Sequence, residues 1–168
     1  MSLSTNTRDY RPALLGLTAL AIVLDRLSKL WIVKHVDSGS AITVIPGVFR
    51  LTHVLNTGAA FSLFADTLSP LAVRNSLIAF SVIAIILVLA FLWRTGRELS
   101  LSSIALALIL GGAIGNLYDR VRYHHVIDFL EVHIVHYHWP DFNVADSCIV
   151  IGACLLLLEI FRPQPTAN

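Results

Sequence analysis

The sequence is short of charge: only 14% of its 168 residues are Asp, Glu, Lys or Arg, whereas 56% are hydrophobic. A soluble globular domain carries about 25% charged residues, so much of this surface is expected to face lipid. Twelve Lys and Arg against 11 Asp and Glu leave a formal charge of +1. The sequence therefore has no basic field that would recruit nucleic acid and no basic cluster that would tether it electrostatically to a membrane surface.

Cysteine is also scarce, and the signatures of serine hydrolases are absent. Cys148 and Cys154 lie six positions apart in one apolar segment, and a helix at about 100° per residue turns them roughly 240° from each other. They are therefore expected to be buried thiols rather than a disulfide. The sequence has no Gly-x-Ser-x-Gly elbow, and Ser28 and Lys29 are neighbours that diverge on a helix. A serine mechanism is not expected.

Histidine, in contrast, is concentrated in one stretch. Five of the seven histidines lie at His124, His125, His133, His136 and His138. The spacing at 133–138 can collect imidazoles around a metal ion, but no Cys lies nearby and the sequence has no His-Glu-x-x-His helix. We predict interfacial histidines without a metal, and no cofactor.

Long apolar segments dominate the chain. A membrane span needs about 20 apolar residues, and the four segments predicted to span are 12–36, 75–93, 99–118 and 142–161. Only the middle two are free of internal charge. The sequence thus predicts an α-helical integral membrane protein with four transmembrane helices. We expect a single membrane-embedded domain over 1–162 and a disordered tail over 163–168.

Arginine on the tails and on the short middle connection sets the predicted orientation: Arg8, Arg11, Arg94, Arg97 and Arg162. Because positive charge favours the cytoplasmic side, both termini are predicted to be cytoplasmic, and 37–74 and 119–141 extracytoplasmic. Within the first connection, β-branched runs broken by turn residues indicate a small β-sheet over 41–64. The second connection is rich in His and aromatic residues and is expected to hold a short helix or a loop.

Two carboxylates stand at the ends of apolar segments. Asp128 precedes Phe129, and Asp146 follows Asn143 in Asn-Val-Ala-Asp. An ionisable residue at membrane depth costs roughly 2.5–3.5 kcal/mol, so it is a functional candidate by default. A helix N-terminus favours the ionised form of Asp146, whereas desolvation favours the protonated form of Asp128. Different environments of this kind mark an acid and a base, although a helix cap and an ordinary loop residue would give the same spacing.

Polar residues also mark the first and third predicted spans. Gly112, Asn116 and Arg120 recur every four positions and so share one helix face. The amide and the guanidinium can hold a carboxylate or a carbonyl oxygen, whereas helix packing with an interfacial Arg is the plainer interpretation. Asp25 and Lys29 form an i,i+4 pair, which either is structural, holds a neighbouring helix or lines a polar cavity.

Five motifs in this order resemble the signal peptidase II family, the lipoprotein signal peptidases of bacterial membranes. They are Asp25-Arg-Leu-Ser-Lys29, Asn56-Thr-Gly-Ala-Ala-Phe61, Gly111-Gly-Ala-Ile-Gly-Asn-Leu-Tyr-Asp-Arg120, Val126-Ile-Asp-Phe129 and Phe142-Asn-Val-Ala-Asp-Ser147. Each motif is weak alone, but together they cover nearly the whole chain. The resemblance implies an intramembrane aspartic endopeptidase that removes signal peptides from diacylglyceryl-modified prolipoproteins, cleaving before the lipidated Cys.

The resemblance also implies roles for particular residues. Asp128 and Asp146 match the catalytic dyad, and no metal is required. The supporting or substrate-contacting positions are Asn56, Asn116, Arg120, Asn143, Asp25, Lys29 and Gly112. The implied partners are the lipid-modified prolipoprotein and membrane lipid, with no nucleic acid. A monomer in the bacterial cytoplasmic (inner) membrane is expected, with its active site toward the extracytoplasmic face.

Three alternatives compete with this interpretation. Intramembrane Asp, Lys and Arg also mark a proton or ion relay subunit, but Asp128 and Asp146 are expected at span ends and the sequence shows no internal repeat. A non-enzymatic assembly factor would tolerate Asp128→Asn. A presenilin-like protease would need Gly-x-Gly-Asp within a span, and Tyr118-Asp119 does not provide it.

Overall fold

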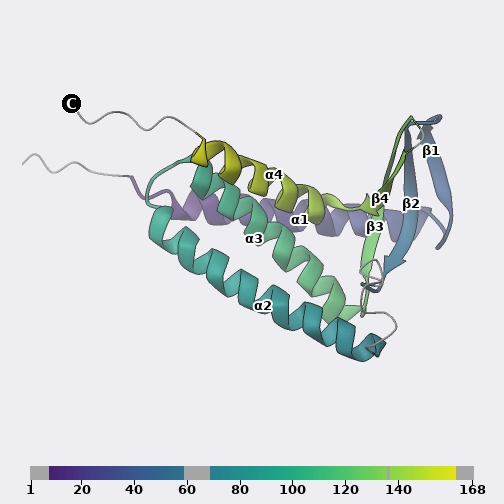
Figure 1. The fold of residues 1–168 in the computed structure, drawn as a ribbon, viewed down its shortest axis with the longest axis horizontal. Coiled ribbons are helices and arrows are strands. Elements are labelled where there is room, and N and C mark those ends of the chain that lie inside the picture. Colours follow the sequence, from purple (N-terminus) through teal and green to yellow (C-terminus); the bar gives the residue numbers. More distant parts are fainter. Residues whose placement is uncertain (1–7, 59–68, 136, 162–168) are drawn as a thin grey trace, which may run out of the picture.

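The computed structural model describes residues 8–58, 69–135 and 137–161, and these residues form four helices and a four-stranded sheet (Figure 1). In chain order, the elements are α1 (Arg11–His35), β1 (Ala41–Ile45), β2 (Phe49–Asn56), α2 (Pro70–Thr95), α3 (Leu101–Arg122), β3 (Val126–Ile134), β4 (Tyr137–Phe142) and α4 (Val144–Ile160). The predicted tail over 163–168 lies outside the described residues.

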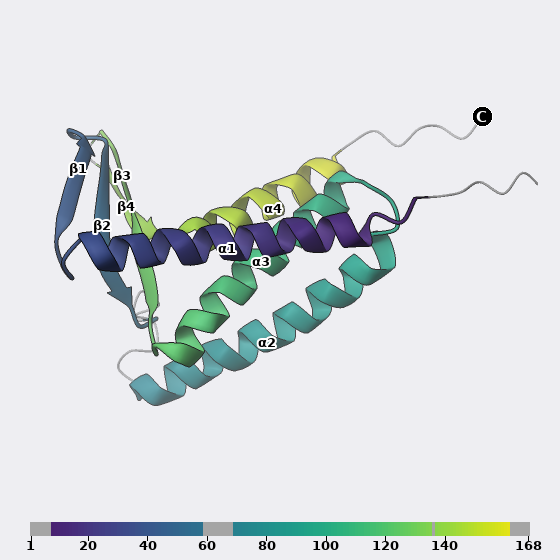
Figure 2. The same ribbon diagram turned by 180° about the vertical axis from the view of Figure 1, so that it is seen from behind.

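The helices lie alongside one another, and the sheet stands across one end of the bundle (Figures 1 and 2). Helix α3 is central and packs against α1, α2 and α4. Helix α2 lies on the outside of the bundle, with α3 as its main neighbour. The beginning of α4 and the end of α3 both lie at the end of the bundle that meets the sheet, whereas the end of α4 lies at the opposite end.

The helix boundaries follow local capping chemistry. The Ser69 hydroxyl accepts a hydrogen bond from the backbone N–H of Ala72 at the start of α2. At the start of α3, Ser100 and Ser103 form a capping box, in which each side chain accepts from the other residue's backbone N–H. Such caps satisfy N–H groups that the first turn of a helix leaves without partners.

Helices α2 and α3 are long and apolar enough to cross a membrane, with mean hydropathies of 2.8 and 1.7 over their most apolar windows. In α2, Leu92 is the one residue that is buried, so nearly all of this helix presents apolar side chains outward. Helix α1 carries buried charged residues and α4 has 17 residues. The helical membrane fold is thus confirmed in outline, whereas the number of four spans stays a prediction.

The sheet joins both connections that were predicted to lie outside the membrane. Its strand order is β1-β2-β3-β4, with antiparallel pairing throughout. The predicted small sheet in the first connection is confirmed by β1 and β2, while residues 59–64 lie outside the described part. The prediction of a short helix or loop within 119–141 is wrong: β3 and β4 form there, because β3 pairs with β2 across more than 70 positions of sequence.

Candidate active site

The N-terminus of α4 holds Asp146 rigidly. Asn143 and Asp146 form a capping box: the Asn143 side-chain oxygen accepts from the Asp146 backbone N–H at 2.9 Å, and Asp146 Oδ2 accepts from the Asn143 backbone N–H at 3.2 Å. The sequence pattern Asn-Val-Ala-Asp therefore does form the predicted helix start. One carboxylate oxygen of Asp146 is used by this cap, and the other, Oδ1, faces α3.

Strand β3 places Asp128 beside this cap. Its Oδ1 accepts a hydrogen bond of 2.7 Å from Asn143 Nδ2, and its Oδ2 accepts one of 2.8 Å from Asn56 Nδ2 on β2. The pairing of Val54 with Asp128 and of Asn56 with Val126 brings the two strands into this register. Asp128 is only 2% exposed, so a carboxyl group that local spacing left ambiguous lies buried among amides.

Asn116 on α3 closes the connection between the two acids. Its Nδ2 donates to Asp146 Oδ1 at 2.8 Å, and its Oδ1 accepts from Asn143 Nδ2 at 3.3 Å. Since Asn143 also donates to Asp128, one continuous hydrogen-bond network contains both carboxylates. The structure thus brings together five residues from β2, α3, β3 and the start of α4: Asn56, Asn116, Asp128, Asn143 and Asp146.

Burial raises the pKa of Asp128 from 3.8 to about 6. Loss of water disfavours the charged carboxylate most strongly, and the negative charge of Asp146 adds to the effect. Hydrogen bonds from Asn56 and Asn143 favour the ionised form and oppose the shift. Asp128 can therefore hold or release a proton near neutral pH, as a general acid or base requires.

Arg120 lies one helical turn after Asn116, on the same face of α3. Its guanidinium is partly buried and close enough to act electrostatically on Asp146 and Asp128. A fixed positive charge beside two acids stabilises negative charge at the site. The predicted alignment of Gly112, Asn116 and Arg120 along one face is consistent with these positions.

Gly112 lies where α3 and α4 touch. A Cβ atom at this position would lie 2.2 Å from the backbone oxygen of Ala145 and 2.8 Å from Ile149 Cγ1. Real Cβ atoms do not approach backbone so closely, so any larger residue would push α4 away. The consequence is positional: Gly112 sets the separation of the two helices that carry Asn116 and Asp146.

A second, fully buried cluster lies behind the two acids. Lys29 Nζ is 2.8 Å from Asp25 Oδ2, 2.7 Å from Asp119 Oδ2 and 3.2 Å from Asn116 Oδ1. Asp25 Oδ1 in turn accepts from the Ala145 backbone N–H at 2.9 Å. Of the three roles that the sequence left open for Asp25 and Lys29, the contacts show that the pair connects α1 to α3 and α4, and Lys29 also lines the cavity described below.

Asp119 is the member of this cluster that sequence reasoning missed. It is 1% exposed and also binds Arg26, whose guanidinium is 3.4 Å away and hydrogen-bonds the Tyr123 hydroxyl. Its position next to Arg120 in the third motif was the available signal, since it lies three positions after Asn116, on nearly the same face. Two cations and two acids therefore balance one another.

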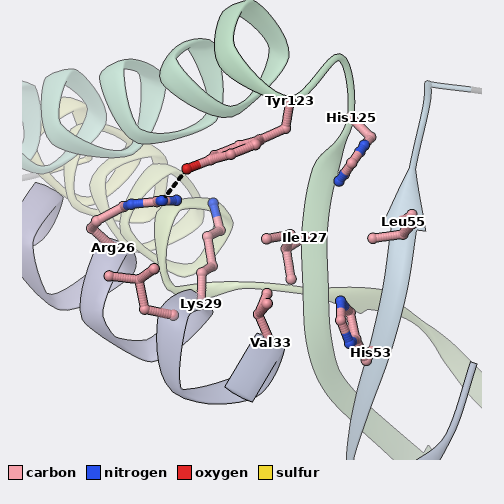
Figure 3. Close-up of a pocket in the computed structure, with 9 residues that line it drawn as sticks. Arg26, Lys29, Val33, His53, Leu55, Tyr123, His125 and Ile127 are labelled. Atoms are coloured by element: carbon pink, nitrogen blue, oxygen red, sulfur yellow. Dashed lines mark hydrogen bonds between the residues drawn. The ribbon is translucent and has the colours of Figure 1, made fainter. Parts of the chain in front are cut away.

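A cavity of about 200 Å³ opens beside this charged cluster. Arg26, Lys29 and Val33 line it from α1, while His53 and Ile127 line it from the sheet (Figure 3). In Figure 3, the Arg26 guanidinium reaches across the cavity's edge to the Tyr123 hydroxyl. The cavity is a neighbour of the ion pairs and is not lined by Asp128 or Asp146.

Comparison with known proteins gives consistent results over nearly the full chain. The family model described as "Signal peptidase (SPase) II" matches residues 17–162. A lipoprotein signal peptidase from Pseudomonas syringae is 45% identical over 98% of this chain and 94% of its own length. One from Solibacter usitatus is 40% identical over 95% of this chain and 96% of its own length.

The fold matches solved structures as well. A bacterial membrane enzyme determined by the in meso method at 1.9 Å resolution superposes with a TM-score of 0.83 and 25% identity, covering 95% of this chain and 99% of that one. A second such structure, at 2.3 Å resolution, gives a TM-score of 0.80 and supports the fold. The resemblance drawn from the five motifs is confirmed: the chain belongs to the signal peptidase II family.

Proposed function

We propose that the chain is an intramembrane aspartic endopeptidase that removes signal peptides from diacylglyceryl-modified prolipoproteins, cleaving before the lipidated Cys. Membership of the signal peptidase II family supports the reaction class. The observation that supports the aspartic mechanism is the single hydrogen-bond network that contains Asp128 and Asp146. The relay and assembly-factor alternatives find no support, since the matched relatives are lipoprotein signal peptidases.

In the proposed mechanism, one aspartate is ionised and the other is protonated. The ionised carboxylate takes a proton from a water molecule, and the oxygen of that water bonds to the scissile carbonyl carbon. The protonated partner polarises the carbonyl oxygen. As the C–N bond breaks, a proton passes from the dyad to the leaving amine. No metal or cofactor enters this reaction.

Burial raises the pKa of Asp128 to about 6, which supports the proposal that Asp128 holds the proton when the pair shares one. Asp146 lies in the first turn of α4, where backbone N–H groups and the helix dipole favour negative charge. This division repeats the sequence-based assignment of an acid and a base. The protonation steps nevertheless belong to the coupled pair, so measured pKa values describe the dyad as a whole.

The supporting residues act through position. Asn56, Asn116 and Asn143 donate hydrogen bonds that orient the carboxylates. Arg120 supplies positive charge for the oxyanion that develops in the transition state, or for the substrate backbone. Asp25, Lys29 and Gly112 keep α1, α3 and α4 in register behind the dyad.

The proposed setting is the bacterial inner membrane. All four helices span it, both termini are cytoplasmic, and the sheet lies on the extracytoplasmic side above the dyad. The signal peptide and the acyl chains of the substrate reach the site from the bilayer, beside apolar helices such as α2. The chain works as a monomer with membrane lipid as its solvent.

Cleavage of a diacylglyceryl-modified lipoprotein precursor in detergent tests the proposal. We expect Asp128→Asn and Asp146→Asn each to lower turnover by roughly 10²–10⁴-fold, the contribution of a positioned acid or base. Asp37→Asn, a change at an exposed aspartate after α1, is the matched control and keeps wild-type turnover. Circular dichroism and gel filtration confirm that each variant is folded. Substantial turnover by either dyad variant would remove the dyad mechanism.

A further inference from the structure

The histidine-rich stretch, which the proposed function leaves unused, gathers three metal-ligating groups on the sheet. Glu131 Oε1 lies 3.0 Å from His133 Nε2 and 2.8 Å from His138 Nε2. All three ligand atoms lie within 4.8 Å of one another. His133 and His138 face each other across β3 and β4, with stacked rings 5.0 Å apart.

We propose that Glu131, His133 and His138 bind a divalent transition-metal ion of the Zn²⁺ class. Imidazole nitrogen and carboxylate oxygen are ligands that Zn²⁺ accepts at about 2.0–2.2 Å. Each histidine Nε2 lies about 3 Å from Glu131 Oε1, so each can share one ion with this oxygen at that bond length, provided that the imidazoles are neutral and turn their lone pairs inward. The sequence favoured histidines without a metal, because it has no His-Glu-x-x-His helix and no Cys nearby; that Glu131 joins the histidines is visible only in the structure.

Neighbouring residues support this ligand set. Arg50 on β2 donates to both oxygens of Glu131 at 2.5 Å, which fixes the orientation of the carboxylate. Metal-binding carboxylates are commonly oriented by such outer hydrogen bonds. Asp141 Oδ2 lies 3.9 Å from His138 Nε2 and supplies a second negative charge to offset Arg50.

Exposure gives an ion access to the site. Glu131 is 3% exposed, whereas the side chains of His133 and His138 are 31% and 52% exposed. The arrangement is a buried anchor with two ligands at the surface. Because β4 is the edge strand of the sheet, an ion held between the two strands would fix β4 to β3.

The alternative to a metal ion at this site is protonation of His133 and His138. If the histidines are charged, they simply form ion pairs with Glu131 and need no metal. The two occupants differ in a measurable way, because a metal must displace the protons from both Nε2 atoms and bind in a fixed ratio to the chain.

The test uses the full chain in detergent, freed of any affinity tag and stripped with chelator before titration with Zn²⁺ by calorimetry. We expect one ion per chain. His133→Gln and His138→Gln should each weaken binding by at least about tenfold, and the double variant should lose it. His35→Gln, at an exposed histidine near the end of α1, is the matched control and keeps wild-type binding.

Co²⁺ provides a readout on the wild type that does not depend on the folding of any variant. A visible absorption spectrum of a bound, low-coordinate Co²⁺ ion that Zn²⁺ abolishes supports the site. The proposal is overturned if the wild type takes up no Zn²⁺ saturably, or if the double variant binds as the wild type does. Neither result bears on signal-peptide cleavage, so the proposed function stands or falls separately.

Discussion

Two pairs of aspartates lie near Asn116, three of the four side chains buried and that of Asp146 partly buried, and the pairs are stabilised in different ways. Asp25 and Asp119 contact the cations Lys29 and Arg26. Asp128 and Asp146 instead accept hydrogen bonds from neutral amides. A cation in direct contact strongly favours the ionised acid, whereas an amide leaves it able to exchange a proton.

The two pairs have different roles within one hydrogen-bond network: one pair connects the helices, and the other is proposed to carry out the chemistry. The ion-paired aspartates connect α1 to α3 and α4. Among the amide-bound aspartates, Asp128 has a pKa that burial raises to about 6, so its protonation can change near neutral pH. Asn116 touches both groups, since its oxygen accepts from Lys29 and its nitrogen donates to Asp146.

The largest effect on stability is expected from removing the cation of the structural pair. Lys29→Met leaves Asp25 and Asp119 without their shared partner, and an uncompensated buried charge costs about 3–5 kcal/mol. Chemical unfolding in detergent should show this loss in the free energy of unfolding. Lys34→Met, at an exposed lysine of the same helix, is the control and should stay near wild type.

A double change sharpens this result. Adding Asp25→Asn to Lys29→Met removes the carboxylate that has lost its cation, whereas Asp119 still contacts Arg26. We therefore expect part of the lost stability to return. If the double variant is as unstable as the sum of the single changes, the residues do not interact as the contacts indicate.

A smaller effect, on the cleavage rate, is expected from a change at Arg120, whose positive charge acts on Asp128 and Asp146. Arg120→Lys keeps the charge but loses the planar fork of donors, and misplacement of a positioning group costs roughly up to 10²-fold in rate. We expect kcat to fall while the protein stays folded. Arg122→Lys, two positions later and exposed, is the control; wild-type kcat in Arg120→Lys would limit Arg120 to anchoring the helix.

The pH dependence of cleavage probes the amide-bound pair directly. The proton on Asp128 is lost as pH rises through about 6, so kcat/KM should fall on the alkaline side of the profile. Asn56→Ala removes a donor that favours the ionised form, so the pKa of Asp128 should rise further and the alkaline limb should move to higher pH. Asn75→Ala, an exposed change in α2, should leave the limb in place. A limb that moves to lower pH would contradict the assignment.

The smallest effect is expected from chelator. The amide-bound aspartates are proposed to act without metal, so incubation with chelator should leave the initial rate of precursor cleavage unchanged. The same treatment removes any ion bound at Glu131, which allows both sites to be examined in one sample. A chelator-sensitive rate that added Zn²⁺ restores would connect the histidine cluster to catalysis.

Local features of the site were readable from the sequence. The pair Asp25 and Lys29 is separated by one helical turn, and the Asn143 and Asp146 pattern describes a helix start, so both contacts depend only on nearby positions. Cys148 and Cys154 are free thiols, as predicted on the same grounds, but Cys148 is only partly buried and Cys154 is exposed, so the prediction that they are buried is wrong. The resemblance to a family then supplied what spacing left open, namely that the two acids belong together.

Features that depend on distant pairing were not readable. Strand β3 forms because β2 lies beside it, and nothing in the composition of 119–141 indicates that partner. Pro140 argues against a strand at β4 on propensity alone, whereas the β-branched and aromatic residues of β3 were a local strand signal that the sequence analysis did not use. Asp119 and Glu131 were missed for the same reason, since their partners Lys29 and Arg50 are far away in the chain.

The outward-facing apolar surface of α2 has a kinetic consequence. An enzyme whose substrate arrives through the lipid phase responds to the substrate's mole fraction in that phase rather than to its concentration in the buffer. Adding empty detergent micelles at constant amounts of protein and precursor lowers the mole fraction of precursor in the detergent phase, and cleavage should therefore slow. A Michaelis constant for this chain is meaningful only when the amount of amphiphile is stated with it.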